Sequence, residues 1–70
     1  MPGSISVIVE ANGNSSKRSL ESGSTAADLL RLLDLLPDAH IVVKDRLPIP
    51  ITQALKDGDR IRIIRVASGG

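Results

Sequence analysis

The sequence has no cysteine and no aromatic residue, and each absence excludes several kinds of function. Without cysteine the chain cannot form a disulfide, supply a thiolate ligand to a metal or use a cysteine nucleophile. Without Phe, Tyr or Trp it lacks the side chains on which most readers of single-stranded RNA stack bases. The core of the fold must therefore be aliphatic, and any thiol chemistry that involves this chain must use a cysteine of a partner.

The net charge is small, and few residues could serve as catalytic groups. Nine basic and eight acidic residues give a formal charge of +1, which offers no electrostatic footprint for nucleic acid. The start, MPGSISVIVE, has no basic segment, and its apolar run is too short for a signal peptide or a membrane span. The single histidine, His40, cannot form a metal site alone. We therefore expect a cytoplasmic monomer without cofactor, metal or enzymatic activity, which contacts neither nucleic acid nor membrane directly.

Extended segments occur at both ends of the sequence. Residues 5–9, ISVIV, are mostly β-branched and predict a strand. Asn12-Gly13 is a strong hairpin signal, so residues 15–20 should return as a second, more polar strand. Further strands are expected at residues 41–44 and 60–66, separated by the proline-containing stretch LPIPI, which suits an edge strand or a loop.

The last of these strands, residues 60–66, follows a turn at Asp57-Gly58-Asp59, and arginines alternate with isoleucines along its first half. Ile61 and Ile63 should point to one face of a sheet. Ile64, together with the neighbouring arginines Arg60 and Arg62, should point to the other.

One helix is expected between the hairpin and the later strands. Ser24 or Thr25 can cap it, Asp28 suits the positive end of its dipole, and Pro37 should end it. An apolar stripe recurs at helical spacing, with Leu30 and Leu35 beside it: Ala26, Leu29, Leu32, Leu33 and Leu36. The order of elements predicts an α+β fold in which one amphipathic helix covers one face of a mixed sheet, whose first and last strands lie parallel.

Four stretches of the sequence together resemble one protein family. They are GSTAADLLRLLDL, IVVKDRLPIP, LKDGDRIRII and the final Gly69-Gly70. In this order they are similar to the β-grasp sulfur carriers and ubiquitin-like modifiers, above all to the small archaeal modifier proteins, with thiamine and molybdopterin sulfur carriers as near relatives. The resemblance implies a ubiquitin-like β-grasp domain over residues 1–66, with a sheet of four to five strands. One departure is Asp45-Arg46, where such carriers often have Asn-Gly.

The resemblance also implies a chemistry for the carboxyl end. In such proteins an E1-like enzyme uses ATP to adenylate the terminal carboxylate, which then becomes a thiocarboxylate or is joined to a target lysine. Carried over, Gly70 is the activated residue and Gly69 its slender neighbour. Residues 67–70 would form a flexible tail that spans roughly 14 Å when extended. Glycine suits this role because, without a Cβ atom, it can pass a narrow channel and leave its carbonyl open to attack.

A tail that enters another protein's active site requires a docking surface beside it. We expect Ile64 and Val42 on the sheet face away from the helix, with Arg62 and Arg65 adding charged contacts. Acceptors for conjugation of the chain to itself would be Lys17, Lys44 and Lys56. The partners would be the E1-like enzyme and either a sulfur-accepting enzyme or target lysines.

Two alternatives remain open from the sequence. The chain could be a dedicated sulfur carrier for thiamine or molybdopterin synthesis. It could also be a non-covalent β-grasp interaction module that binds partners by its sheet edge or face and needs no free carboxyl end.

Overall fold

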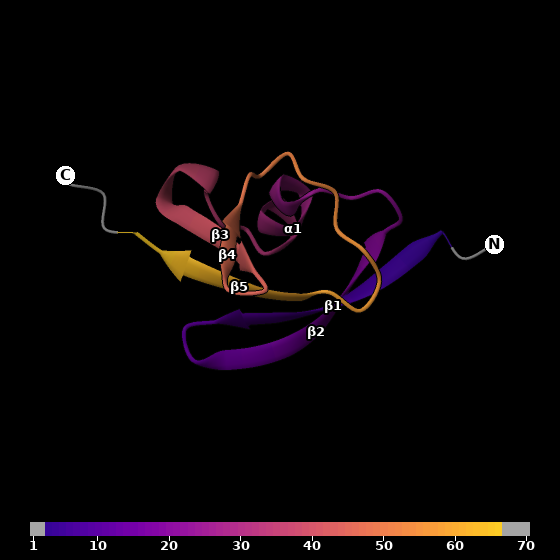
Figure 1. The fold of residues 1–70 in the computed structure, drawn as a ribbon, viewed down its shortest axis with the longest axis horizontal. Helices are drawn as coiled ribbons and strands as arrows, with labels where there is room; N and C mark the ends of the chain where they lie inside the picture. Colours follow the sequence, from indigo (N-terminus) through magenta and orange to yellow (C-terminus); the bar gives the residue numbers. More distant parts are fainter. Residues whose placement is uncertain (1–2, 67–70) are drawn as a thin grey trace.

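The computed structural model describes residues 3–66, which form a five-stranded mixed sheet with one α-helix on one face (Figure 1). In chain order the elements are β1 (Ser4–Ala11), β2 (Asn14–Glu21), α1 (Ala26–Leu32), the 3-10 helix η1 (Pro37–Ala39), β3 (His40–Lys44), β4 (Leu47–Ile49) and β5 (Arg60–Arg65). The strand order is β2-β1-β5-β3-β4. β1 and β5 are parallel and the other neighbours antiparallel, which confirms the predicted mixed sheet.

Both antiparallel hairpins close with two residues in the left-handed region. Asn12 and Gly13 have φ angles of 54° and 77°, as the Asn-Gly signal predicts for a type I′ turn. Asp45 and Arg46 have φ angles of 53° and 69°, so the β3–β4 hairpin uses the same turn without glycine. This backbone costs a residue with a Cβ atom about 1 kcal/mol or more. The β3–β4 turn is therefore strained at Arg46.

The helix begins where the sequence predicts and ends earlier. Thr25 caps it: the Thr25 hydroxyl accepts a hydrogen bond from the Asp28 N–H, and the Asp28 carboxylate accepts one from the Thr25 N–H, at 2.9 Å. These bonds to the charged form hold the pKa of Asp28 below its ordinary value of 3.8. At the other end Asp34 has a φ of 61°, and the Leu35 N–H donates to the Leu30 carbonyl at 2.8 Å.

That bond closes a Schellman motif, in which a left-handed residue stops a helix. The prediction that Pro37 ends the helix is therefore wrong. Leu32 lies in α1 away from the face that buries Leu29 and Leu30, and Leu36 follows the turn at Asp34. These two leucines are 51% and 71% exposed, so the predicted continuous stripe does not form.

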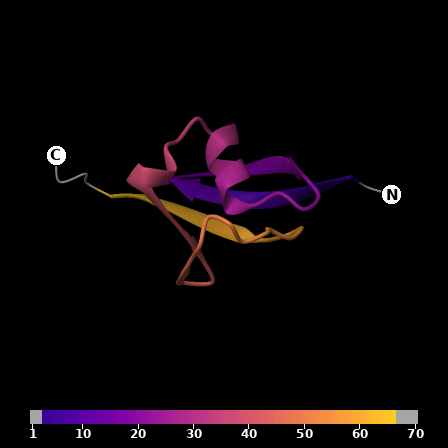
Figure 2. The same cartoon turned by 90° about the horizontal axis from the view of Figure 1, so that it is seen from above.

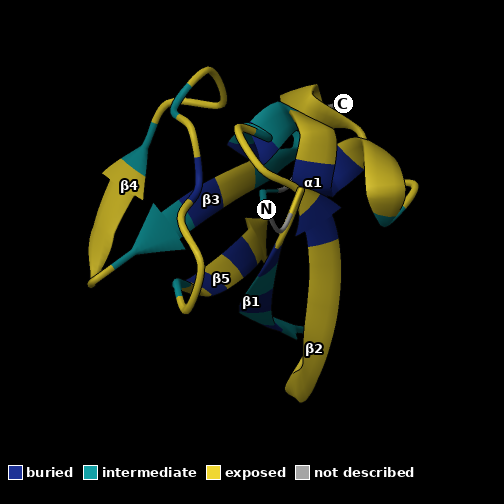
Figure 3. Cartoon of the chain, turned by 90° about the vertical axis from the view of Figure 1, so that its right-hand side faces the viewer, coloured by how far each residue is buried: buried dark blue, intermediate teal, exposed yellow. Residues whose placement is uncertain are grey.

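A single aliphatic cluster fills the space between the sheet and α1 (Figure 3). Its buried members are Ile5, Val7, Val9, Leu20, Ala26, Leu29, Leu30, Val42, Leu55, Ile61 and Ile63. Leu30, which was expected only beside the helical stripe, is one of them. Every large side chain of this cluster is branched and aliphatic, as a chain without aromatic residues requires.

The loop before β5 is fastened to the start of β1. The Asp57 carboxylate accepts a hydrogen bond from the Ser6 N–H at 2.7 Å, and Gly58 N–H donates to the Ser6 carbonyl at 2.7 Å. The Asp59 carboxylate accepts from the Lys56 N–H at 2.8 Å. The predicted turn is thus confirmed, and its carboxylates fix where β5 begins. From there β5 runs to the opposite end of the molecule from the start of β1 (Figure 2).

Candidate partner-docking face

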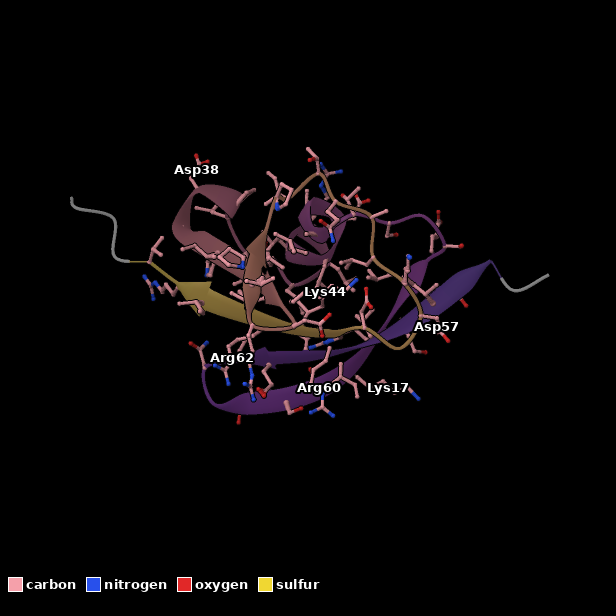
Figure 4. The ribbon with its side chains drawn as sticks, in the orientation of Figure 1. Lys17, Asp38, Lys44, Asp57, Arg60 and Arg62 are labelled. Atoms are coloured by element: carbon pink, nitrogen blue, oxygen red, sulfur yellow. The ribbon has the colours of Figure 1, made fainter. Side chains whose placement is uncertain are left out.

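β5 is the central strand of the sheet, and its alternation separates two faces. Ile61 and Ile63 are 0% and 5% exposed and lie in the core. Arg60, Arg62 and Ile64 alternate with them and are exposed, so they lie on the face away from α1, as predicted. Figure 4 shows Arg60 and Arg62 on this side of the sheet. We call it the outer face and define it by Ile8, Glu10, Ile41, Val43, Arg60, Arg62 and Ile64, which the strand registers place together.

An apolar pair lies on the outer face near the end of β5. Ile64 is 43% exposed and lies opposite Ile41, which is 40% exposed, in the antiparallel register of β3 and β5. Val42, predicted for this face, is 1% exposed and belongs to the core, so that prediction is wrong. Three consecutive β-branched residues in β3 give no polar–apolar alternation from which a face could be assigned. The exposed partner of Ile64 is therefore Ile41, which the sequence reasoning missed.

Charged side chains flank the apolar pair. An Arg62 guanidinium nitrogen lies 3.6 Å from a Glu10 carboxylate oxygen, across the parallel β1–β5 pair. Both side chains are well exposed, so this ion pair contributes at most about 1 kcal/mol to stability and can be opened by a partner. Arg65 alternates to the other side of β5 and lies opposite His40 in the register. Arg62 therefore lies on the same face of the sheet as Ile64, whereas Arg65 lies on the helix side.

A hollow that the sequence did not reveal lies on the helix side of the β5 end. It has a volume of about 280 Å³, and Leu36, His40 and Arg65 contribute to its lining. His40 Nδ1 lies 2.8 Å from the Leu36 carbonyl oxygen and donates to it in the tautomer that carries the proton there. Leu36 was assigned to the core from its helical spacing, so no signal in the sequence marked it as exposed.

The described chain stays attached to the sheet as far as its last residue. The Val66 N–H donates to the Ala39 carbonyl at 2.9 Å, which continues the pairing of β5 beyond Arg65. The predicted reactive residues Gly69 and Gly70 lie outside the described residues. The outer face and the hollow therefore border the point from which the chain continues toward Gly70.

The three predicted acceptor lysines differ in their surroundings. Lys44 Nζ lies 3.2 Å from an Asp59 carboxylate oxygen, and the two side chains are only 21% and 12% exposed. Lys17 on β2 and Lys56 in the loop before β5 are exposed. An amine must be reachable to attack an acyl group, so the ion pair and the low exposure disfavour Lys44.

Neither a metal centre nor a membrane segment is found in residues 3–66. No three of their His, Asp or Glu side chains gather closely enough to hold an ion. None of the helices there has the length and hydropathy that crossing a bilayer requires. The candidate functional features of the described residues are therefore the outer face, the hollow and the ion pairs between charged side chains.

Comparisons with known proteins agree on both family and fold. The family model of small archaeal modifier protein 2 matches residues 4–67. A small archaeal modifier protein 2 from Haloferax volcanii is 34% identical over 67 residues, which cover 94% of this chain and all of the relative. A Caldiarchaeum subterraneum ubiquitin has a TM-score of 0.73 at 16% identity, covering 97% of this chain and 100% of that one. A designed protein based on ubiquitin has a TM-score of 0.77 at 16% identity, with 99% and 96% covered.

Proposed function

The chain belongs to the small archaeal modifier protein 2 family, and from this premise we propose that an E1-like enzyme activates its Gly70 carboxylate for transfer. The chain is a ubiquitin-like modifier with a β-grasp fold, and modifiers of this family are not enzymes. The observation that carries the proposal is the match over residues 4–67 together with alignment along the whole length of the Haloferax relative. Activation and transfer are thus the work of partners.

The first step makes the carboxylate reactive. A carboxylate is a poor electrophile because neither of its oxygens is a good leaving group. The partner enzyme would transfer AMP from ATP to the Gly70 carboxylate and release pyrophosphate, which leaves an acyl-adenylate. A thiolate then attacks the Gly70 carbonyl carbon, and AMP departs. Because this chain has no cysteine, that thiolate belongs to a partner.

Two products can follow from the activated end. A thioester with the partner's cysteine passes the acyl group to a lysine amine, which forms an isopeptide bond and releases the thiol. A persulfide of the partner instead attacks through its outer sulfur, displaces AMP and forms an acyl disulfide. A second thiol of the partner then cleaves the S–S bond, which leaves a disulfide in the partner and sulfur on Gly70 as a thiocarboxylate that can supply sulfur to an acceptor enzyme. Where the chain is its own target, we expect Lys17 and Lys56 to react before Lys44, whose amine is paired with Asp59.

Docking of the folded part would hold the carboxyl end in the partner's active site. We propose that the activating enzyme contacts the outer face around Ile41 and Ile64, with Arg62 meeting a carboxylate of the enzyme in place of Glu10. Exposed apolar side chains next to a charged rim are typical of the centre of a transient interface. Arg65 and the hollow at Leu36 would meet the same partner from the helix side.

The test is ATP–pyrophosphate exchange with the cognate activating enzyme. Deletion of Gly70, or addition of one alanine after it, should abolish exchange, because the terminal carboxylate then lies one residue short of the partner's active site or one residue beyond it. Gly3→Ala is the matched control, since Gly3 has no heavy atom within 4 Å of an added Cβ and lies far from the carboxyl end in sequence. Exchange that survives both changes at Gly70 would contradict the proposal.

A further inference from the structure

The sheet has two free edges, and they are built differently. β4 is three residues long and contains Pro48, which has no backbone N–H to donate to an added strand. β2 is eight residues long, contains no proline and pairs with β1 through all eight residues. Short, proline-containing edge strands resist pairing with other chains. The β4 edge is therefore protected, and no strand among residues 3–66 other than β1 pairs with β2.

The free backbone groups of β2 can be assigned from the register. A two-residue turn is flanked by a hydrogen-bonded pair, here Ala11 and Asn14, and such pairs alternate along an antiparallel ladder. Asn14, Ser16, Arg18 and Leu20 thus bond to β1. The N–H and C=O groups of Ser15, Lys17 and Ser19 point away from the sheet, whereas the Glu21 carbonyl accepts a hydrogen bond from the Ser24 N–H at 3.0 Å. Seven of the eight residues of β2 are exposed, so the groups that point away from the sheet are reachable. In Figure 3 the strand has the colour of exposed residues over most of its length.

The charge on β2 decides which strand could be added. Lys17 and Arg18 are neighbours near the middle of β2 and point to opposite faces of the sheet. If two copies paired antiparallel about the middle of β2, either the two Lys17 or the two Arg18 side chains would lie opposite each other, because opposite residues share a face, and like charges in that position are destabilising. An extended segment with acidic residues at its middle would meet a cation on each face instead.

From these observations we propose that β2 is a docking edge for an acidic extended peptide segment of a partner protein, which adds to the sheet as a sixth strand. The added main chain would bond to the outward groups of Ser15, Lys17 and Ser19. Its acidic side chains would pair with Lys17 on the outer face and with Arg18 on the helix side. This edge lies two strands from β5, so the inference goes beyond the proposed activation of Gly70 and needs no activating enzyme.

The experiment is an NMR titration of the isotope-labelled protein with the peptide acetyl-Thr-Val-Asp-Glu-Val-Thr-amide. Its control is acetyl-Thr-Val-Lys-Lys-Val-Thr-amide, which has the same outer residues and the opposite charge. We expect the acidic peptide to bind at least about tenfold more tightly, which corresponds to 1.4 kcal/mol. The largest amide shifts should fall on Ser15, Lys17 and Ser19.

Two variants separate charge from backbone pairing. The double variant Lys17→Glu/Arg18→Glu should reverse the preference to the basic peptide. Ser19→Pro removes one outward N–H while sparing the bonds to β1, and it should weaken binding of the acidic peptide about tenfold. Arg46→Glu makes the same kind of charge change at the opposite edge and should leave binding unchanged.

Three results of the peptide titration would overturn the inference. They are equal binding of the two peptides, shifts centred on Ile41 and Ile64 instead of β2, and no shift at millimolar peptide. Amide shifts on β2 that depend on protein concentration without peptide would identify a second copy as the occupant, which also contradicts it.

Discussion

The two faces of the sheet differ in whether other elements of the described chain pack against them. The face toward α1 carries the buried aliphatic residues, and removing any of them leaves a cavity in the only core that the described residues form. The outer face carries arginines, a carboxylate and two exposed isoleucines, and no element of the described chain covers it. Both sets alternate along β5. One strand therefore contributes core residues with one side and, in the proposed function, the docking surface with the other.

Leu29→Ala should give the largest effect and act on the fold alone. Leu29 is a fully buried residue of α1, so truncation should lower the free energy of unfolding by about 3 kcal/mol. Urea denaturation measures this change. At temperatures where the variant remains folded, its exchange rate with the activating enzyme should match that of the unaltered protein. A specific activation defect in the folded variant would contradict the assignment of the inner face to the fold alone.

Ile64→Ala should produce the reverse pattern. Loss of an exposed apolar contact at the centre of an interface should lower kcat/KM for activation about tenfold. The free energy of unfolding should change by no more than about 0.5 kcal/mol. Ile51→Ala is the matched control, because Ile51 is 37% exposed but lies in the loop after β4. Equal kinetics for the two variants would remove Ile64 from the docking surface.

Thr25→Ala tests how firmly α1 is held over the inner face. The substitution removes the hydroxyl that accepts from the Asp28 N–H, so it should cost about 1 kcal/mol of stability. Thr52→Ala, an exposed threonine in the loop after β4, serves as the control. Thermal unfolding monitored by circular dichroism measures the stability of both variants. Equal stability of both variants would mean that packing of Leu29 and Leu30 alone positions the helix.

Arg46→Gly should stabilise the protein by about 1 kcal/mol. Glycine relieves the strain of a φ of 69° in the β3–β4 turn, whereas Arg46→Ala keeps it and should give no gain. Because Asp45-Arg46 lies outside both faces, neither variant should alter activation. A stabilised variant with impaired activation would show that the arginine is held in this strained turn for a partner.

Asp28→Asn should have the smallest effect of the five substitutions. It should change how the stability depends on pH in acid. The pKa of Asp28 is lowered in the folded protein, since its carboxylate accepts hydrogen bonds from Thr25. Its contribution is therefore complete above the ordinary value of 3.8 and is lost as the pH falls through the lower folded value. Urea midpoints measured from pH 5 downward should fall less steeply for the variant. Parallel pH profiles would contradict the cap as the cause.

The fold was predictable where local signals agree with one another. Asn12-Gly13 predicts the first hairpin because its residues tolerate positive φ, and β5 reveals its two faces because arginines and isoleucines alternate. Asp34 and Arg46 adopt left-handed backbones that their side chains disfavour, so the helix end and the second turn carried weaker signals. Val42 was placed on the wrong face, since β3 lacks alternation. Ile41 and Leu36 emerged only from the register and the helix end.

The most direct test of the account is mass spectrometry of the protein from its own cells, with the cognate activating enzyme present. Trypsin cuts after Arg65, so each conjugated lysine would retain the remnant VASGG, and a thiocarboxylate would replace one oxygen mass by one sulfur mass at Gly70. We predict at least one of these two signatures. A carboxyl end that stays an ordinary carboxylate, with no remnant on any lysine, would contradict the account.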